Sequence, residues 1–76
     1  MEERAMTYGE KAVGLTFNPS GDPKVQKLKE LYAEIIDLLD DQLPGPSQEQ
    51  GRLIKIAVAE AQGAQMWAVK AATWKD

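Results

Sequence analysis

The chain has 76 residues, carries a formal net charge of −3, and contains neither cysteine nor histidine. This length suits one small domain, and the missing thiols and imidazoles exclude a disulfide scaffold, thiolate metal sites and the commonest general base. The negative charge argues against duplex DNA or RNA as a partner, because such binding requires a basic face. A domain this small without disulfides or metal generally gains stability by oligomerisation.

The hydropathy pattern predicts no contact with a membrane. No apolar run reaches the roughly 18 residues that a membrane-spanning helix needs. The first residues, Met-Glu-Glu-Arg, lack the basic and apolar segments of a secretory signal peptide. We therefore expect a cytoplasmic protein without a membrane partner.

Residues 1–21 predict a mostly irregular N-terminal arm. Residues that interrupt a helix recur along it, namely Gly9, Gly14, Pro19 and Gly21. It also carries more apolar side chains than a free tail would: Tyr8, Val13, Leu15 and Phe17. We expect this arm to lie ordered on the helices that follow, with room for a short helical turn around residues 7–13.

A first long helix is predicted over residues 22–42. Asp22 is a favourable N-cap, and Pro23 is a favourable first helical residue. Apolar residues then follow at a 3-4-3-4 spacing that keeps them on one face: Val25, Leu28, Tyr32, Ile35 and Leu39. Three more widen that face: Leu31, Ile36 and Leu38. A face this wide indicates contact with more than one neighbour.

A short turn over residues 43–47 and a second long helix over residues 48–73 complete the chain. The turn contains two prolines and a glycine, and its short length makes the two helices antiparallel neighbours. Ser47 and Gln50 fit a capping box at the start of the second helix. Apolar residues cover most of that helix's circumference, so we expect it to be buried between subunits. The predicted fold is an all-α antiparallel hairpin with an irregular arm.

Neither catalysis nor metal binding is supported by the residue types present. Asp37, Asp40 and Asp41 could cluster near the end of the first helix, but a solvated acidic face is the simpler interpretation. Ser20 and Ser47 have no histidine to activate them and suit a turn and a cap. We expect no enzyme activity, no metal and no cofactor.

Anion binding is better supported by the lysines around the start of the first helix. Lys24, Lys27 and Lys29 lie near its N-terminus, which favours negative rather than positive charge, so a docked anion would remove the conflict. Lys11 lies on the arm, and Tyr8 offers a flat face on which a base could stack. The alternative is that these lysines are ordinary solubilising charges, with Lys27 paired to Glu30 or Glu34.

Two tryptophans seven residues apart mark one face of the second helix. Trp67 and Trp74 lie near Met66, in a pattern typical of an oligomer interface. The alternative is an aromatic pocket where subunits meet. Lys70 interrupts this apolar surface, so its ammonium must either reach solvent or meet a negative charge.

Three segments carry a resemblance to a known family: Tyr-Gly-Glu-Lys-Ala-Val-Gly-Leu-Thr-Phe-Asn-Pro-Ser-Gly-Asp (8–22), Leu-Tyr-Ala-Glu-Ile-Ile-Asp-Leu-Leu (31–39) and Ala-Gln-Met-Trp-Ala-Val-Lys-Ala-Ala-Thr (64–73). Over residues 8–74 the chain resembles the helical-hairpin domain of phage anti-CBASS sponge proteins, which also occurs in Thoeris anti-defence sponges. The resemblance implies sequestration of cyclic nucleotide second messengers, without cleavage, in the cytoplasm of an infected bacterium. It also implies a compact hexamer, built as a trimer of dimers.

The resemblance implies two kinds of ligand pocket. One takes cyclic dinucleotides such as 3′,3′-cyclic GMP–AMP, with a stacking tyrosine and a phosphate-binding lysine. Our candidates for this pocket are Tyr8 as the tyrosine, Lys29 as the lysine, and Gly9, Lys11 and Lys24 beside them. A gapless alignment instead puts Gly14 or Leu15 at the tyrosine position.

The second implied pocket lies on the threefold axis and takes cyclic trinucleotides through an arginine. Lys70 falls at that position, where it supplies a point charge in place of a bidentate fork. The rival hypothesis for the whole chain is an oligomeric helical-hairpin scaffold or protein-interaction module with no nucleotide ligand.

Overall fold

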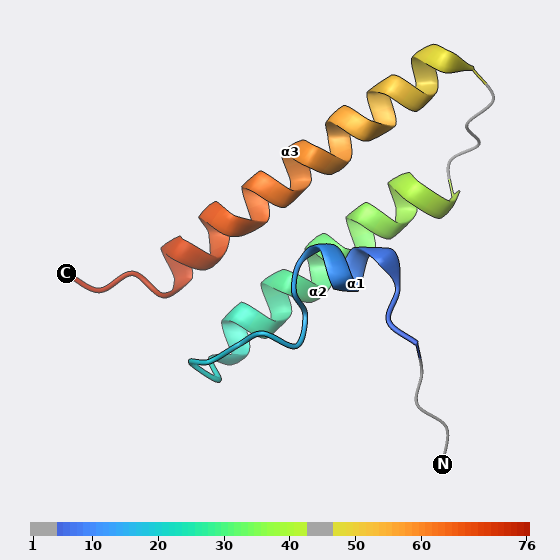
Figure 1. Cartoon of the computed structure of the whole chain (residues 1–76). Helices are drawn as coiled ribbons and strands as arrows, with labels where there is room; N and C mark the ends of the chain where they lie inside the picture. The colour runs from blue at the N-terminus through green and yellow to red at the C-terminus, as the bar shows by residue number, and fades with distance from the viewer. Residues whose placement is uncertain (1–4, 43–46) are drawn as a thin grey trace.

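The computed structural model describes residues 5–42 and 47–76, and these residues are helical with no strand among them. The elements are α1 (Tyr8–Ala12), α2 (Pro23–Asp37), a π-helical turn η1 (Leu38–Gln42) and α3 (Gln48–Ala72). Helices α2 and α3 run antiparallel as a hairpin, and α1 lies against α2 (Figure 1). The predicted all-α hairpin is confirmed. Most of the predicted turn, residues 43–46, lies outside the described residues.

Local signals set both ends of the short helix α1. Thr7 and Glu10 form a reciprocal capping box: the Glu10 amide donates to Thr7 Oγ1 at 3.1 Å, and the Thr7 amide donates to Glu10 Oε1 at 2.9 Å. Two residues after Ala12, Gly14 adopts a φ of 64°, which a residue with a Cβ rarely does. The helix is therefore held to a single short stretch within the arm.

Local caps also set the starts of the two long helices. The Asp22 side chain accepts from the Lys24 amide at 2.8 Å, and Pro23 follows as the first helical residue. Ser47 accepts from the Gln50 amide at 3.0 Å. Among the hydrogen bonds of the described residues, the return bond from the Gln50 side chain is not present, so only half of that predicted capping box forms.

The buried face of α2 differs from the predicted one. Four residues are buried along it at a 4-4-3 spacing: Val25, Lys29, Ala33 and Ile36. Ile35, which we placed in the middle of the buried stripe, is 46% exposed, whereas Ile36 is fully buried. The difference comes from tertiary packing. The arm and α3 both pack on α2, and Ile36 lies in the core cluster where Val13 of the arm meets Val58 of α3.

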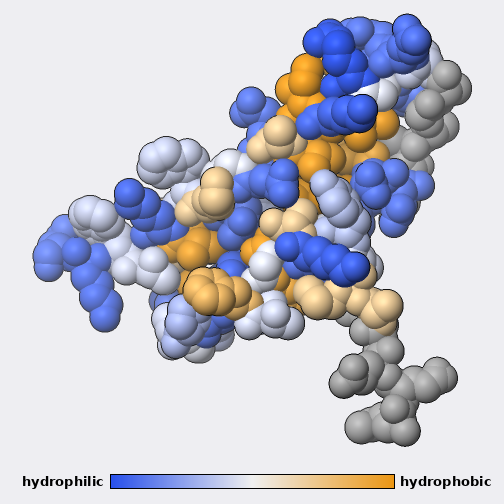
Figure 2. Space-filling view, in the orientation of Figure 1, coloured by the Kyte–Doolittle hydropathy of each residue, from blue (hydrophilic) through white to orange (hydrophobic). Residues whose placement is uncertain are grey.

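The single chain is flat and leaves much apolar surface uncovered. Its Cα atoms span 45 × 40 × 12 Å with a radius of gyration of 14.0 Å, against about 11 Å for a compact chain of this length. Large apolar side chains remain exposed on both long helices and the arm: Tyr8, Phe17, Leu31, Ile35, Leu38, Leu53, Ile56, Met66, Trp67 and Trp74. Figure 2 shows apolar side chains interrupting the polar surface on the face in view. One hairpin is therefore too small to cover its own apolar residues.

No helix within residues 5–42 and 47–76 combines the length and the apolar content that crossing a bilayer would require.

Candidate functional site

The arm is fixed to α2 at two polar anchors, and the first is at Gly9. The Gly9 amide donates to Asp37 Oδ1 at 2.7 Å, across 28 residues of chain. Gly9 is buried, and a Cβ at this position would overlap the carbonyl oxygen of Ala33 and lie 2.8 Å from Asp37 Oδ1. Only glycine lets α1 approach α2 this closely, so the predicted binding residue Gly9 has its amide engaged within the fold.

The second anchor is Lys29, whose side chain is only 5% exposed. Its Nζ donates to the carbonyl oxygen of Gly14 at 3.0 Å and to the carbonyl oxygen of Phe17, and it lies 5.5 Å from the centre of the Phe17 ring. These contacts compensate the burial of the ammonium group. Because a lysine ammonium has three N–H donors, one remains after the two carbonyls are satisfied.

The loop that follows Phe17 is braced by its own side chains. Asn18 Nδ2 donates to the Asp22 carbonyl at 3.2 Å, and Ser20 Oγ donates to Asn18 Oδ1 at 3.0 Å. The Asp22 amide in turn donates to Ser20 Oγ at 3.2 Å. Gly21 takes a φ of 67°, which lets the chain turn into α2. The loop is thus ordered by local bonds and presents one defined shape.

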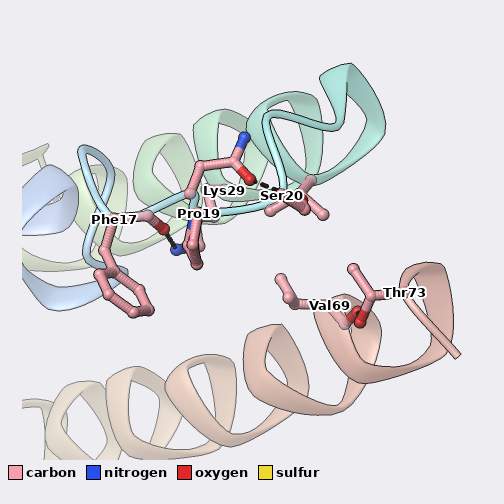
Figure 3. Close-up of a pocket in the computed structure, with 8 residues that line it drawn as sticks. Phe17, Pro19, Ser20, Lys29, Val69 and Thr73 are labelled. Atoms are coloured by element: carbon pink, nitrogen blue, oxygen red, sulfur yellow. Dashed lines mark hydrogen bonds between the residues drawn. The ribbon is translucent and has the colours of Figure 1, made fainter.

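A hollow of about 300 Å³ lies between this loop and the last turns of α3 (Figure 3). Its lining is mostly apolar and comes from the arm, α2 and α3: Phe17, Asn18, Pro19, Ser20, Val25, Lys29, Val69 and Thr73. Thr73 Oγ1 donates to the Val69 carbonyl at 2.9 Å at the end of α3. An apolar cavity with one cation in its wall suits a ligand that joins a flat apolar group to an anion.

Tyr8 and Lys29, which we expected in one pocket, face different hollows of the chain. Tyr8 is 49% exposed and lines a second hollow of about 420 Å³. That hollow lies between the start of α1, η1 and the first half of α3, where its lining includes Lys55 and Gln62. A single chain therefore does not bring the predicted tyrosine and lysine together.

The remaining predicted lysines are exposed. Lys11 and Lys24 are both at the surface, and neither lines the hollow beside Lys29. Lys70 is exposed as well, with its Nζ 5.5 Å from the centre of the Trp67 ring. Its ammonium reaches solvent along the tryptophan, which is one of the two outcomes we expected for a lysine on this apolar face.

Asp37, Ser20 and Ser47 have structural roles in the fold. Asp37 holds the Gly9 amide, Ser20 braces the loop, and Ser47 caps α3. Within the described part of the chain, no group of three or more acidic side chains is placed to hold a metal ion. In the first turns of α3, the Arg52 guanidinium forms an exposed pair with Glu49 and holds the pKa of that carboxyl below its ordinary value.

The walls of the Lys29 hollow include three residues that the sequence pattern does not indicate as binding residues: Phe17, Val69 and Thr73. Phe17 was assigned to the packing of the arm, and Val69 and Thr73 were assigned to a helix buried between subunits. The available signal was the turn-rich Phe-Asn-Pro-Ser-Gly stretch. A braced loop next to a long helix forms a concave surface. The residues of α3 that face this loop are about 50 residues away in sequence, so the local pattern does not predict the contact.

A search of curated proteins and a search of solved structures each found no significant match. A family model described as Acb2/Tad1, hairpin domain, matches residues 10–73. The match begins within α1 and ends at the C-cap of α3, so it includes the Lys29 anchor, the braced loop and the hollow. Because it covers far more than half of the sequence, the chain belongs to the Acb2/Tad1 hairpin-domain family.

Proposed function

We propose that this protein sequesters cyclic oligonucleotide second messengers and thereby blocks CBASS-type antiphage signalling in the cytoplasm of the infected cell. The observation that carries the proposal is the family membership over residues 10–73, because this family points to a sponge-type anti-defence role. The ligand is held and not cleaved. Binding alone is sufficient, since a messenger held by the sponge is withdrawn from its effector.

The cyclic dinucleotide is proposed to bind at the arm and the first turns of α2, through Tyr8, Gly9, Lys11, Lys24 and Lys29. Support comes from the spare N–H donor of Lys29, which lines an apolar hollow. Tyr8 and Lys29 of one chain line separate hollows. We therefore propose that Tyr8 of one subunit contacts the ligand that Lys29 of another subunit holds. Gly9 acts by fixing the arm on Asp37.

The assembly is proposed to be a hexamer, a trimer of dimers. Its support is the flat shape of one hairpin and the exposed apolar side chains of α3, among them Ile56, Met66 and Trp67. Three copies of Lys70 would then meet on the threefold axis, where a cyclic trinucleotide supplies one phosphate for each. The exposure of Lys70 leaves its charge available for such a contact.

The first test is stabilisation by the ligand. Adding micromolar cyclic GMP–AMP is expected to raise the melting temperature, because a ligand that binds only the folded state shifts the folding equilibrium. A cyclic trinucleotide, cyclic tri-AMP, serves as the second ligand of the panel. Chromatography of the ligand after heat denaturation of the complex is expected to return it intact.

The matched control is linear pApG at the same concentration, which has similar bases but lacks the ring. A melting temperature that responds to neither cyclic compound would contradict the sponge and favour the rival scaffold. Recovery of a linear product would contradict sequestration without cleavage.

The second test is the mass of the assembly in solution. Light scattering at micromolar concentration is expected to report a mass several times the 8.4 kDa of the chain, because burial of the exposed side chains on α3 is the main source of association free energy. A substitution that places a charge on this surface, Ile56→Glu, is expected to lower that mass. A monomeric parent protein would contradict the assembly.

A further inference from the structure

Phe17 has an exposed ring, although its backbone carbonyl is bonded to a buried side chain. The side chain is 71% exposed, yet the Phe17 carbonyl accepts from the buried ammonium of Lys29. The ring adds little to the core, which contains Val13, Val25, Ala33, Ile36, Val58 and Ala61. A large apolar ring held at a fixed place on the surface, beside a cation, is available for a ligand.

We propose that Phe17 and Lys29 together bind one nucleotide unit, with the base stacked on the Phe17 ring and the phosphate on the third N–H of Lys29. This inference rests on the proposed function and adds to it a stacking residue other than Tyr8. A nucleotide carries an aromatic base and an anion one sugar apart, and this site offers an aromatic face and a cation separated by 5.5 Å. Stacking needs no particular base, because every base has a flat face.

The size of the hollow limits what it can hold. Its volume of about 300 Å³ is at the lower end of the range for ligand pockets, which runs from about 300 to 1,000 Å³. We infer that the hollow itself holds one nucleotide unit of the ring. The second unit of the ring therefore projects out of the hollow, where a second subunit and its Tyr8 can stack on the other base.

The far wall of the hollow is supplied by α3. Val69 is half-buried and faces the braced loop, and Thr73 lies one turn further along with its hydroxyl bonded to the Val69 carbonyl (Figure 3). This wall closes the side opposite Phe17 and Pro19. A larger side chain at Val69 would fill the hollow without touching either the ring or the ammonium group.

Three variants test the inference, with cyclic GMP–AMP as the probe and calorimetry as the measurement. Phe17→Ala is expected to weaken binding about tenfold or more, the loss typical of a removed stacking face, while Phe17→Tyr stays within about threefold of the parent. Val69→Phe is expected to weaken binding about tenfold or more by filling the hollow. Phe17→Ala is expected to fold normally, because the bond to Lys29 uses the backbone carbonyl.

Thr16→Ala is the control. Thr16 precedes Phe17 on the same segment of the arm, is exposed, and does not line the hollow. This variant is expected to bind cyclic GMP–AMP within about threefold of the parent. Circular dichroism and light scattering are recorded for every variant, so that a loss of fold or of assembly is seen directly.

The outcomes separate the inference from the function on which it rests. If the parent binds cyclic GMP–AMP and Phe17→Ala binds it equally well, the inference is wrong and the sponge stands. A lowered mass for Phe17→Ala would assign the ring to a subunit interface and would also overturn the inference. If the parent binds no cyclic oligonucleotide, the proposed function itself fails.

Discussion

Gly9→Ala is expected to lower the free energy of unfolding by about 3 kcal/mol, the upper end of the cost of overpacking a close contact. The added methyl group would overlap the Ala33 carbonyl oxygen and crowd Asp37, so α1 would have to move away from α2. That movement also breaks the 2.7 Å bond from the Gly9 amide to Asp37. Urea denaturation followed by circular dichroism measures the change.

Gly51→Ala is the matched control for this substitution. Gly51 lies in the first turn of α3, and a Cβ placed there meets no atom within 4 Å. Alanine is favoured over glycine in a helix by roughly 0.5–1 kcal/mol, so this variant is expected to be as stable as the parent or slightly more so. Equal stability of Gly9→Ala and Gly51→Ala would show that α1 is not packed against α2 as the structure has it.

The starts of the long helices could be predicted because their signals are local. Asp22 and Ser47 each accept a bond from an amide two or three residues away, so the sequence contains both partners of each contact. Pro23 fits the first helical position through its own fixed backbone angle. The start of α1 has the same kind of signal in Thr7 and Glu10. Only a possible turn around residues 7–13 could be expected there, because Gly9 within it and Gly14 after it are unfavourable for a helix.

The buried face of α2 could not be predicted in detail because its neighbours are distant in sequence. A helix with apolar residues at 31, 32, 35, 36, 38 and 39 is apolar over a wide arc, and the pattern alone does not say which edge of that arc is covered. Packing of the arm and α3 selects Ile36 and exposes Ile35. In the proposed assembly, neighbouring hairpins would cover the exposed edge.

The position of Lys29 in the apolar pattern of α2 indicates that its side chain is buried. Val25, Lys29 and Ala33 follow one another at a spacing of four, so the lysine lies in line with buried apolar residues. A lysine on such a line must either reach solvent or find acceptors, and here the acceptors are the carbonyls of Gly14 and Phe17. Because those acceptors are backbone carbonyls of an irregular loop, the pattern of side chains does not predict which of them the lysine reaches.

Lys29→Met is the variant expected to affect both the fold and the binding site. It keeps the apolar stem but removes every donor, so the Phe17 carbonyl loses the Lys29 ammonium and the Gly14 carbonyl keeps only its bond from the Phe17 amide. The expected loss in the free energy of unfolding is about 1–3 kcal/mol. Binding of cyclic GMP–AMP is expected to fall by roughly 10- to 100-fold, since the loop is released and the phosphate loses a charge-assisted hydrogen bond.

Lys24→Met separates this specific contact from general attraction between a basic surface and an anionic ligand. Lys24 lies one turn before Lys29 on α2 but is exposed and outside the hollow. Its loss is expected to weaken binding within about threefold, and the difference should shrink as salt is raised, because exposed charges are screened over about 10 Å at 0.1 M ionic strength. The effect of Lys29→Met should persist at 0.5 M salt, since a buried ammonium in direct contact with a phosphate is screened far less. Equal effects of the two variants, both removed by salt, would mean that Lys29 attracts the ligand only as a general charge and makes no direct contact with the phosphate.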